Sequence, residues 1–505
     1  MLGWKQVLLL GVLTVPDAAD EATVPASVTD HVSVDSLRGR LAFLASDYLE
    51  GRATPSAGLE IAAQFIASQF ASMGLEPAGD DGYFQTARWI VKRRDPVEFS
   101  ASLRRGPSTL ELKLEQITLE ADRDAAFDDA GLVKVDADAT ALAKLGPDAL
   151  RGHVAIAEMP SLRGGRRNPE SFQRMNGFLQ ALASQGAVML LTVDRTGKGL
   201  GFGRGELVDP ENPRPARRTA AIPVVRVHGA EIAAWFDALP AGASDATVSL
   251  TLGPVVDQPV SLRNVVGRLR GSDPALAATC VVISGHYDHI GVSSAGGSDP
   301  IMNGANDDGS GTVTMMELAG AFVAAKPAPR RSLLFVAFFG EELGLLGSRY
   351  FARHPLVPLQ SIVANVNLEQ VGRTDDSDGP HVSEGMLTGY AYSNVGAVLA
   401  AAARPFGVSI HNSAANSEQY FGASDNISLA QLGVPAHTLC TAFQYPDYHG
   451  PGDHWDKIDY DNMAKVARAV AAGVWVIANG SEVPQWSEAE PRAKGFREAW
   501  LKLHE

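Results

Sequence analysis

The sequence predicts an α/β fold in which a mostly parallel sheet is covered by helices on both faces. From residue 265 onward, short apolar runs typical of buried strands alternate with stretches that have the apolar spacing of helices. This alternation predicts parallel strands, because each crossover helix returns the chain to the same end of the sheet. We expect strands at residues 279–284, 332–339, 362–368 and 434–440, and helices at residues 312–325, 345–352, 395–406 and 462–478.

The sequence before residue 265 contains two stretches with different residue patterns. Residues 33–75 are expected to be helical, because apolar residues between 59 and 73 recur at intervals of four and three, and Gly74 follows them. From about residue 94 to 259, short β-prone runs are separated by loops rich in Gly, Pro and Arg. A chain of 505 residues is long enough for two or three domains, so we treat this stretch as a part of its own.

The composition argues against several classes of protein. Hydrophobic residues make up 45% and charged residues 20%, which is the balance of a folded soluble chain. The formal net charge of -15 argues against a nucleic-acid partner, which would require a basic face. The only cysteines are Cys280 and Cys440, so we expect two buried free thiols and no disulfide framework.

The first residues are typical of an export signal. Lys5 precedes an apolar run at residues 7–15, which is far shorter than the roughly 20 residues needed to cross a bilayer. The alternative is a frayed N-terminal tail, since no clear cleavage site follows. We expect residues 1–22 to be a signal peptide and the protein to be periplasmic or secreted, with no later membrane span.

Imidazole and carboxylate side chains follow the predicted strands one after another. Sites in sheets of this type form beyond the carboxyl ends of the strands. Two divalent ions need about three protein ligands each and usually share one carboxylate. The series supplies that number and predicts a two-metal hydrolase; its members are His286, Asp307, Glu341, Glu342, Glu369 and His449.

The first two motifs suggest distinct roles for their residues. His286 and Asp288 are two apart on an extended segment, so Asp288 can accept one ring N–H of His286 and leave the other nitrogen free for a metal. His289 is expected on the opposite side of the strand and outside the site. Asp307 lies in a Gly-rich loop before a helix and is the expected shared ligand, with Asp308 supporting the loop.

The later motifs add the remaining groups. Glu341 and Glu342 end a buried strand, where neighbouring side chains diverge, so one can bind metal while the other faces the attacked carbonyl. Glu369 closes another buried strand, where an acid is costly unless it is paired or bound to a cation. His449 lies in the loop after the last strand. Taken singly, each could be a solvated or hydrogen-bonded residue; the shared order and setting favour the metal site.

With these motifs, the chain resembles the M28 family of zinc peptidases, whose members carry H-x-D, N-D-D-G-S-G, E-E, N-[LM]-[DE] and Y-H in this order. The resemblance covers nearly the whole chain and includes Leu49-Glu50-Gly51-Arg52 before the helix that ends at Gly74. It implies the mostly parallel mixed sheet of the zinc-exopeptidase (phosphorylase/hydrolase-like) fold, with an inserted β-rich protease-associated (PA) domain. The implied parts are the signal peptide at 1–22, the catalytic domain at 23–110 and 255–485, the PA domain at 111–254 and a C-terminal tail at 486–505.

The resemblance implies two zinc ions per chain. His286, Asp307 and Glu369 would hold one ion, while Asp307, Glu342 and His449 would hold the other, so that Asp307 bridges them. One residue departs from the pattern. Many aminopeptidases of this type have Asp where this chain has Glu369, and the longer side chain changes the reach of the carboxylate.

The resemblance also implies catalytic roles. Glu341 would act as general base toward the water activated by two metals, and then as general acid toward the leaving amine. Tyr448 would stabilise the oxyanion, and Asp288 would orient the metal-binding histidine. A cis peptide bond is expected between Asp307 and Asp308.

The expected activity is hydrolysis of the N-terminal peptide bond of peptides by a zinc-dependent aminopeptidase. One alternative is a carboxypeptidase of the same superfamily, which would need a basic pocket for the terminal carboxylate. Two others are a one-zinc glutaminyl cyclase and a receptor-like relative that has lost ligands, and the complete ligand set argues against both. The sequence leaves open the preferred side chain, the native metal, the role of the PA domain and the oligomeric state.

Overall fold

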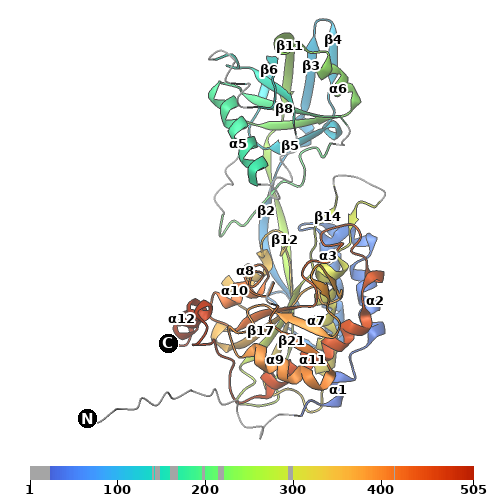
Figure 1. Ribbon diagram of the computed structural model, residues 1–505, viewed down its shortest axis with the longest axis vertical. Helices are drawn as coiled ribbons and strands as arrows, with labels where there is room; N and C mark the ends of the chain where they lie inside the picture. Colours follow the sequence, from blue (N-terminus) through green and yellow to red (C-terminus); the bar gives the residue numbers. More distant parts are fainter. Residues whose placement is uncertain are drawn as a thin grey trace, which may run out of the picture. The chain divides into compact units, whose positions relative to one another are not determined.

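The computed structural model describes residues 23–138, 142, 148–159, 169–195, 199–213, 221–293, 299–413 and 416–505. Residues 1–22, the predicted signal peptide, lie outside these ranges, so that assignment stays a prediction. The chain forms two compact units (Figure 1). The first contains Met1–Ala87, Leu262–Val292 and Ile301–Glu505, and the second contains Arg88–Ser261 and Ser293–Pro300.

Four parallel strands of the first unit lie side by side in a ten-stranded mixed sheet. β13 (Cys280–His286) pairs with β16 (Ser332–Phe338) on one side and with β17 (Ile362–Leu368) on the other, and β17 pairs with β22 (Ala436–Cys440). Every residue of these four strands is buried, as strands covered on both faces require. The predicted parallel sheet is confirmed.

Antiparallel pairings flank these four strands. β12 (Val255–Leu269) runs antiparallel to β16, and β20 (Glu384–Leu387) runs antiparallel to β22. The sheet continues with β21 (Ser409–His411) beside β20, and β1 (Glu76–Pro77) pairs with β12. β2 (Phe84–Arg94) also neighbours β12.

A group of helices packs around α7, the helix that begins directly after the Gly-rich loop. α7 (Gly311–Ala324) is buried along nearly its whole length, because other helices and β13 contact it. Its apolar surface therefore holds the helical layer to the sheet. The helices of this group are α1 (Ala26–Thr29), α2 (Val34–Leu44), α3 (Ala57–Met73) and α11 (Tyr460–Asn479), and α9 (Val395–Ala403) packs on α11.

Local capping explains where α3 and α11 begin and end. The Ser56 hydroxyl accepts a hydrogen bond from the Leu59 amide at 3.0 Å, and Asp459 accepts one from the Asn462 amide at 3.0 Å. α3 ends at Gly74, whose φ of 88° is a left-handed conformation that favours glycine. The predicted end of the helical segment at Gly74 is thus confirmed, although residues 47–52 separate α2 from α3.

A second apolar cluster joins further helices to the sheet. α8 (Leu346–Arg353) and α10 (Asn426–Ala430) contribute Phe351 and Leu429 to a cluster that also contains Val282 and Leu334 of the strands. The residues predicted as a C-terminal tail belong to this cluster as well. Trp486 is buried and donates its indole N–H to the Gly433 carbonyl at 2.7 Å, and α12 (Lys494–Leu503) follows.

In its described residues, the second unit contains an eight-stranded sheet and the helices α5 and α6. The parallel strands β6, β7, β8 and β10 are adjacent, and apolar clusters lie against them. Arg226 and Glu120 form a buried ion pair at 2.9 Å. The elements are β3 (Ser100–Arg105), β4 (Ser108–Glu111), β5 (Ile117–Ala121), β6 (Ala126–Lys134), β7 (Val154–Glu158), α5 (Pro169–Ser184), β8 (Met189–Asp194), β10 (Val224–His228), α6 (Ala230–Asp237) and β11 (Gly242–Thr251).

The boundaries of the second unit differ from the predicted ones. It runs from Arg88 to Ser261, whereas the predicted PA domain covers residues 111–254. The added residues include β3 and β4, which pair with β11 and with each other and so belong to its sheet. Its identity as a PA domain stays a prediction.

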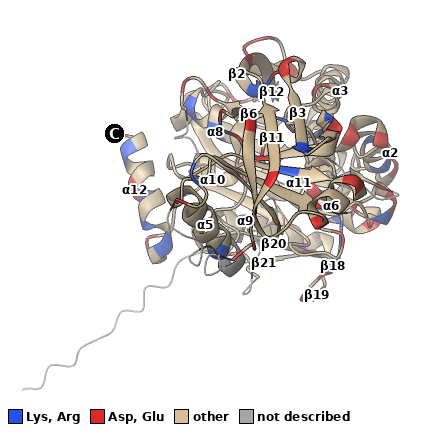
Figure 2. Cartoon of the chain, turned by 90° about the horizontal axis from the view of Figure 1, so that it is seen from above, with Lys and Arg blue, Asp and Glu red and all other residues tan. Residues whose placement is uncertain are grey.

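Two further observations concern the charged residues and the helices. Figure 2 shows Lys and Arg interspersed with Asp and Glu along the elements, with several basic residues on α12. None of the helices in the described part of the chain combines the length and the apolar character that crossing a membrane requires.

His437 of β22 is a buried titratable group of the sheet. Its Nε2 lies 2.6 Å from the Ser393 hydroxyl, and its Nδ1 lies 2.9 Å from the Thr388 carbonyl oxygen. Burial lowers the pKa of His437 to about 4, against an ordinary value near 6.5. Between these two values the unfolded chain binds a proton that the folded chain does not, so stability present above pH 6.5 is lost as the pH falls toward 4.

We predict that His437→Gln flattens this pH dependence. From pH 6.5 to pH 4, the free energy of unfolding of the wild type should fall by about 3 kcal/mol more than that of the variant. Urea unfolding at a series of pH values measures both curves. Parallel curves for the two proteins would contradict the assignment.

Candidate metal centre

The predicted ligand residues meet at the carboxyl ends of the four parallel strands. His286 is the last residue of β13, Glu341 and Glu342 follow β16, and Glu369 follows β17. His449 lies in the loop after β22. Because parallel strands end at the same edge of a sheet, residues up to 163 positions apart in the chain become neighbours.

One group of possible ligands contains His286, Asp307 and Glu369. Their ligand atoms all lie within 4.8 Å of one another, and His286 Nε2 is 3.4 Å from Asp307 Oδ1. All three are buried or nearly so. Ser424, in the turn before α10, donates a hydrogen bond to Glu369 Oε2 and fixes that carboxylate.

A second group lies on the other side of Asp307. His449 Nε2 is 3.0 Å from Asp307 Oδ2 and 3.3 Å from Glu342 Oε2. The two oxygens of Asp307 therefore face different histidines, Oδ1 toward His286 and Oδ2 toward His449. A carboxylate placed in this way can be shared by two cations.

Asp288 contacts both His286 and the backbone of Glu341. The Nδ1 atom of His286 is 3.3 Å from the carbonyl oxygen of Asp288 and 3.6 Å from its carboxylate, so the nearer partner is the backbone and not the predicted side chain. Either contact leaves His286 Nε2 directed at Asp307. The Asp288 carboxylate accepts hydrogen bonds from the Glu341 amide at 3.0 Å and from the Thr54 hydroxyl at 3.2 Å.

His289, which the sequence placed outside the site, lies inside it. Its Nδ1 is 2.8 Å from Glu342 Oε1, its side chain is fully buried, and it forms a third possible ligand group with Asp307 and Glu342. The expected alternation of sides fails because β13 ends at His286, so the chain beyond it is no longer a regular strand. In the sequence, the feature that could have indicated His289 was its position directly after the H-x-D motif.

Two further acids hold the Gly-rich loop by its backbone. Asp308 accepts hydrogen bonds from the amides of His286 at 3.1 Å, Gly311 at 3.0 Å and Gln370 at 3.1 Å, and so ties three ligand segments together. The peptide bond between Asp307 and Asp308 is cis, as expected.

Asp453, which the sequence did not single out, binds the same loop from the other side. It accepts from the amides of Asn306 at 3.0 Å and Asp307 at 3.1 Å, and from the Tyr445 hydroxyl at 2.8 Å.

Arg52 is a fully buried guanidinium behind the site. It donates to the carbonyl oxygens of Tyr287 at 2.8 Å and Gly304 at 2.8 Å, which precede Asp288 and the Gly-rich loop. It also donates to the carbonyls of Leu44 at 2.6 Å and of Asn303 at 2.7 Å. Burial lowers the pKa of Arg52 to about 10, so the group stays charged at neutral pH.

The electrostatics of the site are those of crowded, buried acids. Burial and nearby carboxylates raise the pKa of Glu341 well above its usual range and that of Glu369 to about 7. Burial alone would lower the pKa of His286, but the surrounding carboxylates, Glu341 foremost, raise it well above normal. Burial alone would raise the pKa of Asp307, yet the contacts with His286 and His449 hold it below its ordinary value. Imidazoles and carboxylates held this close are suitable ligands for zinc.

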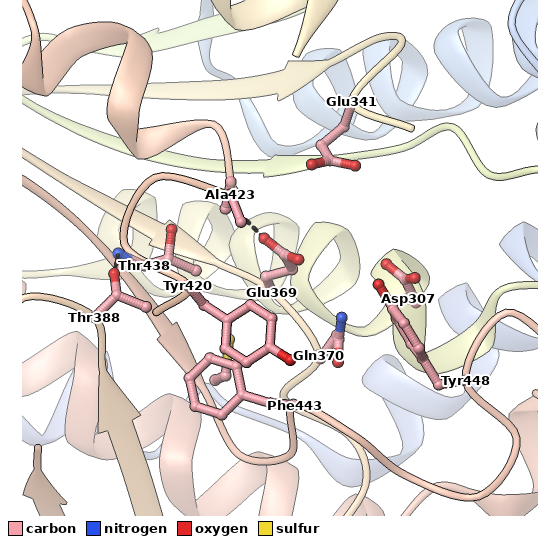
Figure 3. A pocket seen from close by; sticks show the side chains of 12 residues that line it. Asp307, Glu341, Glu369, Gln370, Thr388, Tyr420, Ala423, Thr438, Phe443 and Tyr448 are labelled. Atoms are coloured by element: carbon pink, nitrogen blue, oxygen red, sulfur yellow. Dashed lines mark hydrogen bonds between the residues drawn. The ribbon is translucent and has the colours of Figure 1, made fainter. Parts of the chain in front are cut away.

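A cavity of about 100 Å³ opens onto the carboxylates (Figure 3). None of the described residues that line it is Lys or Arg. The Tyr420 and Phe443 rings form one part of the lining, stacked with their centroids 5.0 Å apart. The lining residues are Asp307, Glu341, Glu369, Gln370, Thr388, Tyr420, Ala423, Ser424, Thr438, Cys440, Phe443 and Tyr448.

Comparison with known proteins finds relatives in one peptidase family. Residues 264–474, which include every predicted ligand position, match the model of peptidase family M28. A probable zinc metalloprotease of Pyrenophora teres f. teres is 29% identical over 45% of this chain and 50% of its own length, and the aminopeptidase YwaD of Bacillus subtilis is 28% identical over 42% and 44%. The chain thus spans about half the length of these curated relatives. The family match and these relatives support an M28 zinc metallopeptidase.

Solved structures agree on the fold. The zinc aminopeptidase BSAP from Bacillus subtilis has a TM-score of 0.56 at 18% identity, and the aminopeptidase from Aneurinibacillus sp. strain AM-1 has a TM-score of 0.53 at 20% identity. Each comparison covers 90% of this chain and 97% of the other. Both units of the chain are therefore included in the structural likeness.

We predict that His289→Leu weakens zinc binding. The change removes the group that contacts Glu342 Oε1, and loss of a residue that orients a metal ligand typically lowers metal affinity by about 10-fold to 100-fold. Zinc retained after dialysis against graded chelator measures the effect. His504→Leu, a matched change at an exposed C-terminal position, is the control. Equal retention by both variants would show that the His289 contact is dispensable.

Proposed function

We propose that this protein is an aminopeptidase that binds two zinc ions and hydrolyses the N-terminal peptide bond of peptides. The observation that carries the proposal is the position of Asp307, whose two oxygens face His286 and His449. His286 and Glu369 would complete one zinc site with Asp307. Glu342 and His449 would complete the other, next to His289.

Zinc, when bound, supplies Lewis acidity that lowers the pKa of water and polarises a carbonyl oxygen. The protein supplies the proton transfers. Glu341 lines the cavity, and its Oε2 lies 3.9 Å from His286 Nε2, so its carboxylate is beside the ligand atoms without belonging to either group. In the proposed reaction Glu341 takes a proton from the attacking water and returns it to the nitrogen of the leaving amine.

Tyr448 is positioned to stabilise the oxyanion. Its ring stacks on His449 with centroids 4.1 Å apart, and it lines the cavity. Burial raises the pKa of Tyr448, so the phenol keeps its proton at neutral pH and can donate a hydrogen bond to the carbonyl oxygen as negative charge develops there.

The charge of the cavity favours the amino end of a peptide over the carboxyl end. A carboxypeptidase needs a cation for the terminal carboxylate, and the described lining contains acids but no Lys or Arg. Glu369, Glu341 and Asp307 instead suit a substrate ammonium group. Export of the protein, suggested by residues 1–22, is part of the same proposal and rests on the sequence alone.

We predict that Glu341→Gln retains zinc but loses turnover by a factor of about 10² to 10⁴, because it removes the proton acceptor and keeps the shape of the side chain. The neighbouring Glu342→Gln is the matched comparison and should lose zinc as well. Metal content and kcat are measured for both proteins. Normal turnover by Glu341→Gln would rule out its role as the base.

We predict that aminoacyl anilides and C-terminally amidated peptides are cleaved, and that N-acetylated peptides are not. Metal analysis should find two zinc ions per chain, and chelation should abolish activity until zinc is restored. Release of C-terminal residues from N-acetylated peptides would support the carboxypeptidase alternative. One zinc per fully active chain would contradict the two-ion arrangement.

A further inference from the structure

Gln370 lines the cavity, and one atom of its side chain lacks a hydrogen-bond partner among the described residues. It directly follows Glu369, lines the same cavity (Figure 3), and is only 5% exposed. Its Oε1 atom is buried and has no hydrogen-bond partner among the described residues. Buried polar atoms are normally hydrogen-bonded, so an unpaired one in a substrate cavity points to a ligand that completes it.

The backbone of Gln370 is fixed in place. Its amide donates to Asp308 Oδ1 at 3.1 Å, and its carbonyl oxygen accepts from the Thr441 amide at 3.2 Å and the Thr441 hydroxyl at 3.0 Å. Its φ of 54° is a left-handed conformation that non-glycine residues seldom adopt, and these bonds hold it there. The Gln370 carboxamide is therefore carried by a backbone segment that hydrogen bonds hold in place beside the cavity.

The threonine and serine hydroxyl groups of the lining are already engaged. The Thr438 hydroxyl donates to Asn426 at 2.8 Å, and the Ser424 hydroxyl donates to Glu369. The Thr388 hydroxyl accepts from the Thr438 amide at 3.0 Å.

The Tyr420 hydroxyl accepts from Gln444 Nε2 at 2.8 Å. Of the buried side-chain oxygen and nitrogen atoms in this lining, the oxygen of Gln370 is the one without a partner among the described residues.

We propose that the Gln370 carboxamide is a specificity-determining group that accepts a hydrogen bond from the first residue of the substrate. This inference rests on the proposed aminopeptidase function. The donor is either the α-ammonium group or an N–H or O–H of the first side chain, and the two sources share the same chemistry. A buried acceptor of this kind disfavours a ligand that leaves it unpaired.

Gln370→Met tests the proposal, because methionine has a similar length and lacks the amide oxygen. Two substrates, glutaminyl and methionyl anilide, have first side chains of similar length with and without an N–H donor. Gln64→Met, an exposed site on α3, is the matched control. Inhibition by n-butylamine probes the ammonium group alone.

Loss of one such hydrogen bond should lower kcat/KM on the order of tenfold. If the side chain is the donor, Gln370→Met should lower kcat/KM for the glutaminyl substrate alone. If the ammonium is the donor, both substrates should be affected, and inhibition by n-butylamine should weaken to a similar extent. Zinc content should stay unchanged in either case, which distinguishes recognition from damage to the metal centre.

The proposal is overturned if Gln370→Met matches Gln64→Met for both substrates and for n-butylamine, or if its losses accompany loss of zinc. A wild-type protein that cleaves neither anilide would overturn the proposed function itself. The two failures are therefore separable: the first leaves aminopeptidase activity intact, and the second removes it.

Discussion

The burial of several carboxylates at one edge of the sheet is the constraint on which the rest of the structure depends. Asp307 lies within a few ångströms of Glu369 in one ligand group and of Glu342 in another, in surroundings that would penalise each uncompensated charge by several kcal/mol. Histidines offset only part of this charge. The arrangement therefore demands cations, and much of the surrounding hydrogen bonding serves to keep the acids close in spite of their repulsion.

That hydrogen bonding acts mainly through the backbone. Asp308 and Asp453 bind amides of the ligand segments, while Arg52 binds the carbonyls that precede them. The carboxylates of Asp308 and Asp453 thus accept hydrogen bonds from backbone amides, while the Arg52 guanidinium donates to backbone carbonyls of the same region. Ligand side chains held on such a frame need little reorganisation to accept an ion, which is the arrangement expected of a preorganised centre.

The sequence predicted the parts of the fold that obey simple periodic rules. The parallel strands were recognisable because burial on both faces gives unbroken apolar runs. His286 and Glu369 were recognisable because they follow such runs, and Asp307 because it lies in a Gly-rich loop before a helix. His289 was wrongly left out, because the alternation rule does not hold beyond the last residue of a strand. Asp453 and three of the four carbonyl contacts of Arg52 depend on segments far apart in the chain, which local patterns do not reveal.

The contacts of Arg52 affect when, during synthesis, the metal centre can form. Its guanidinium belongs to the first eighth of the chain, whereas His449 and Asp453 belong to the last eighth, and the ligand loops need both ends to be in place. A nascent chain still lacking its final segments cannot complete this geometry, since long-range contacts form only once both partners exist. The ligand geometry can therefore form only after nearly the whole chain has been synthesised.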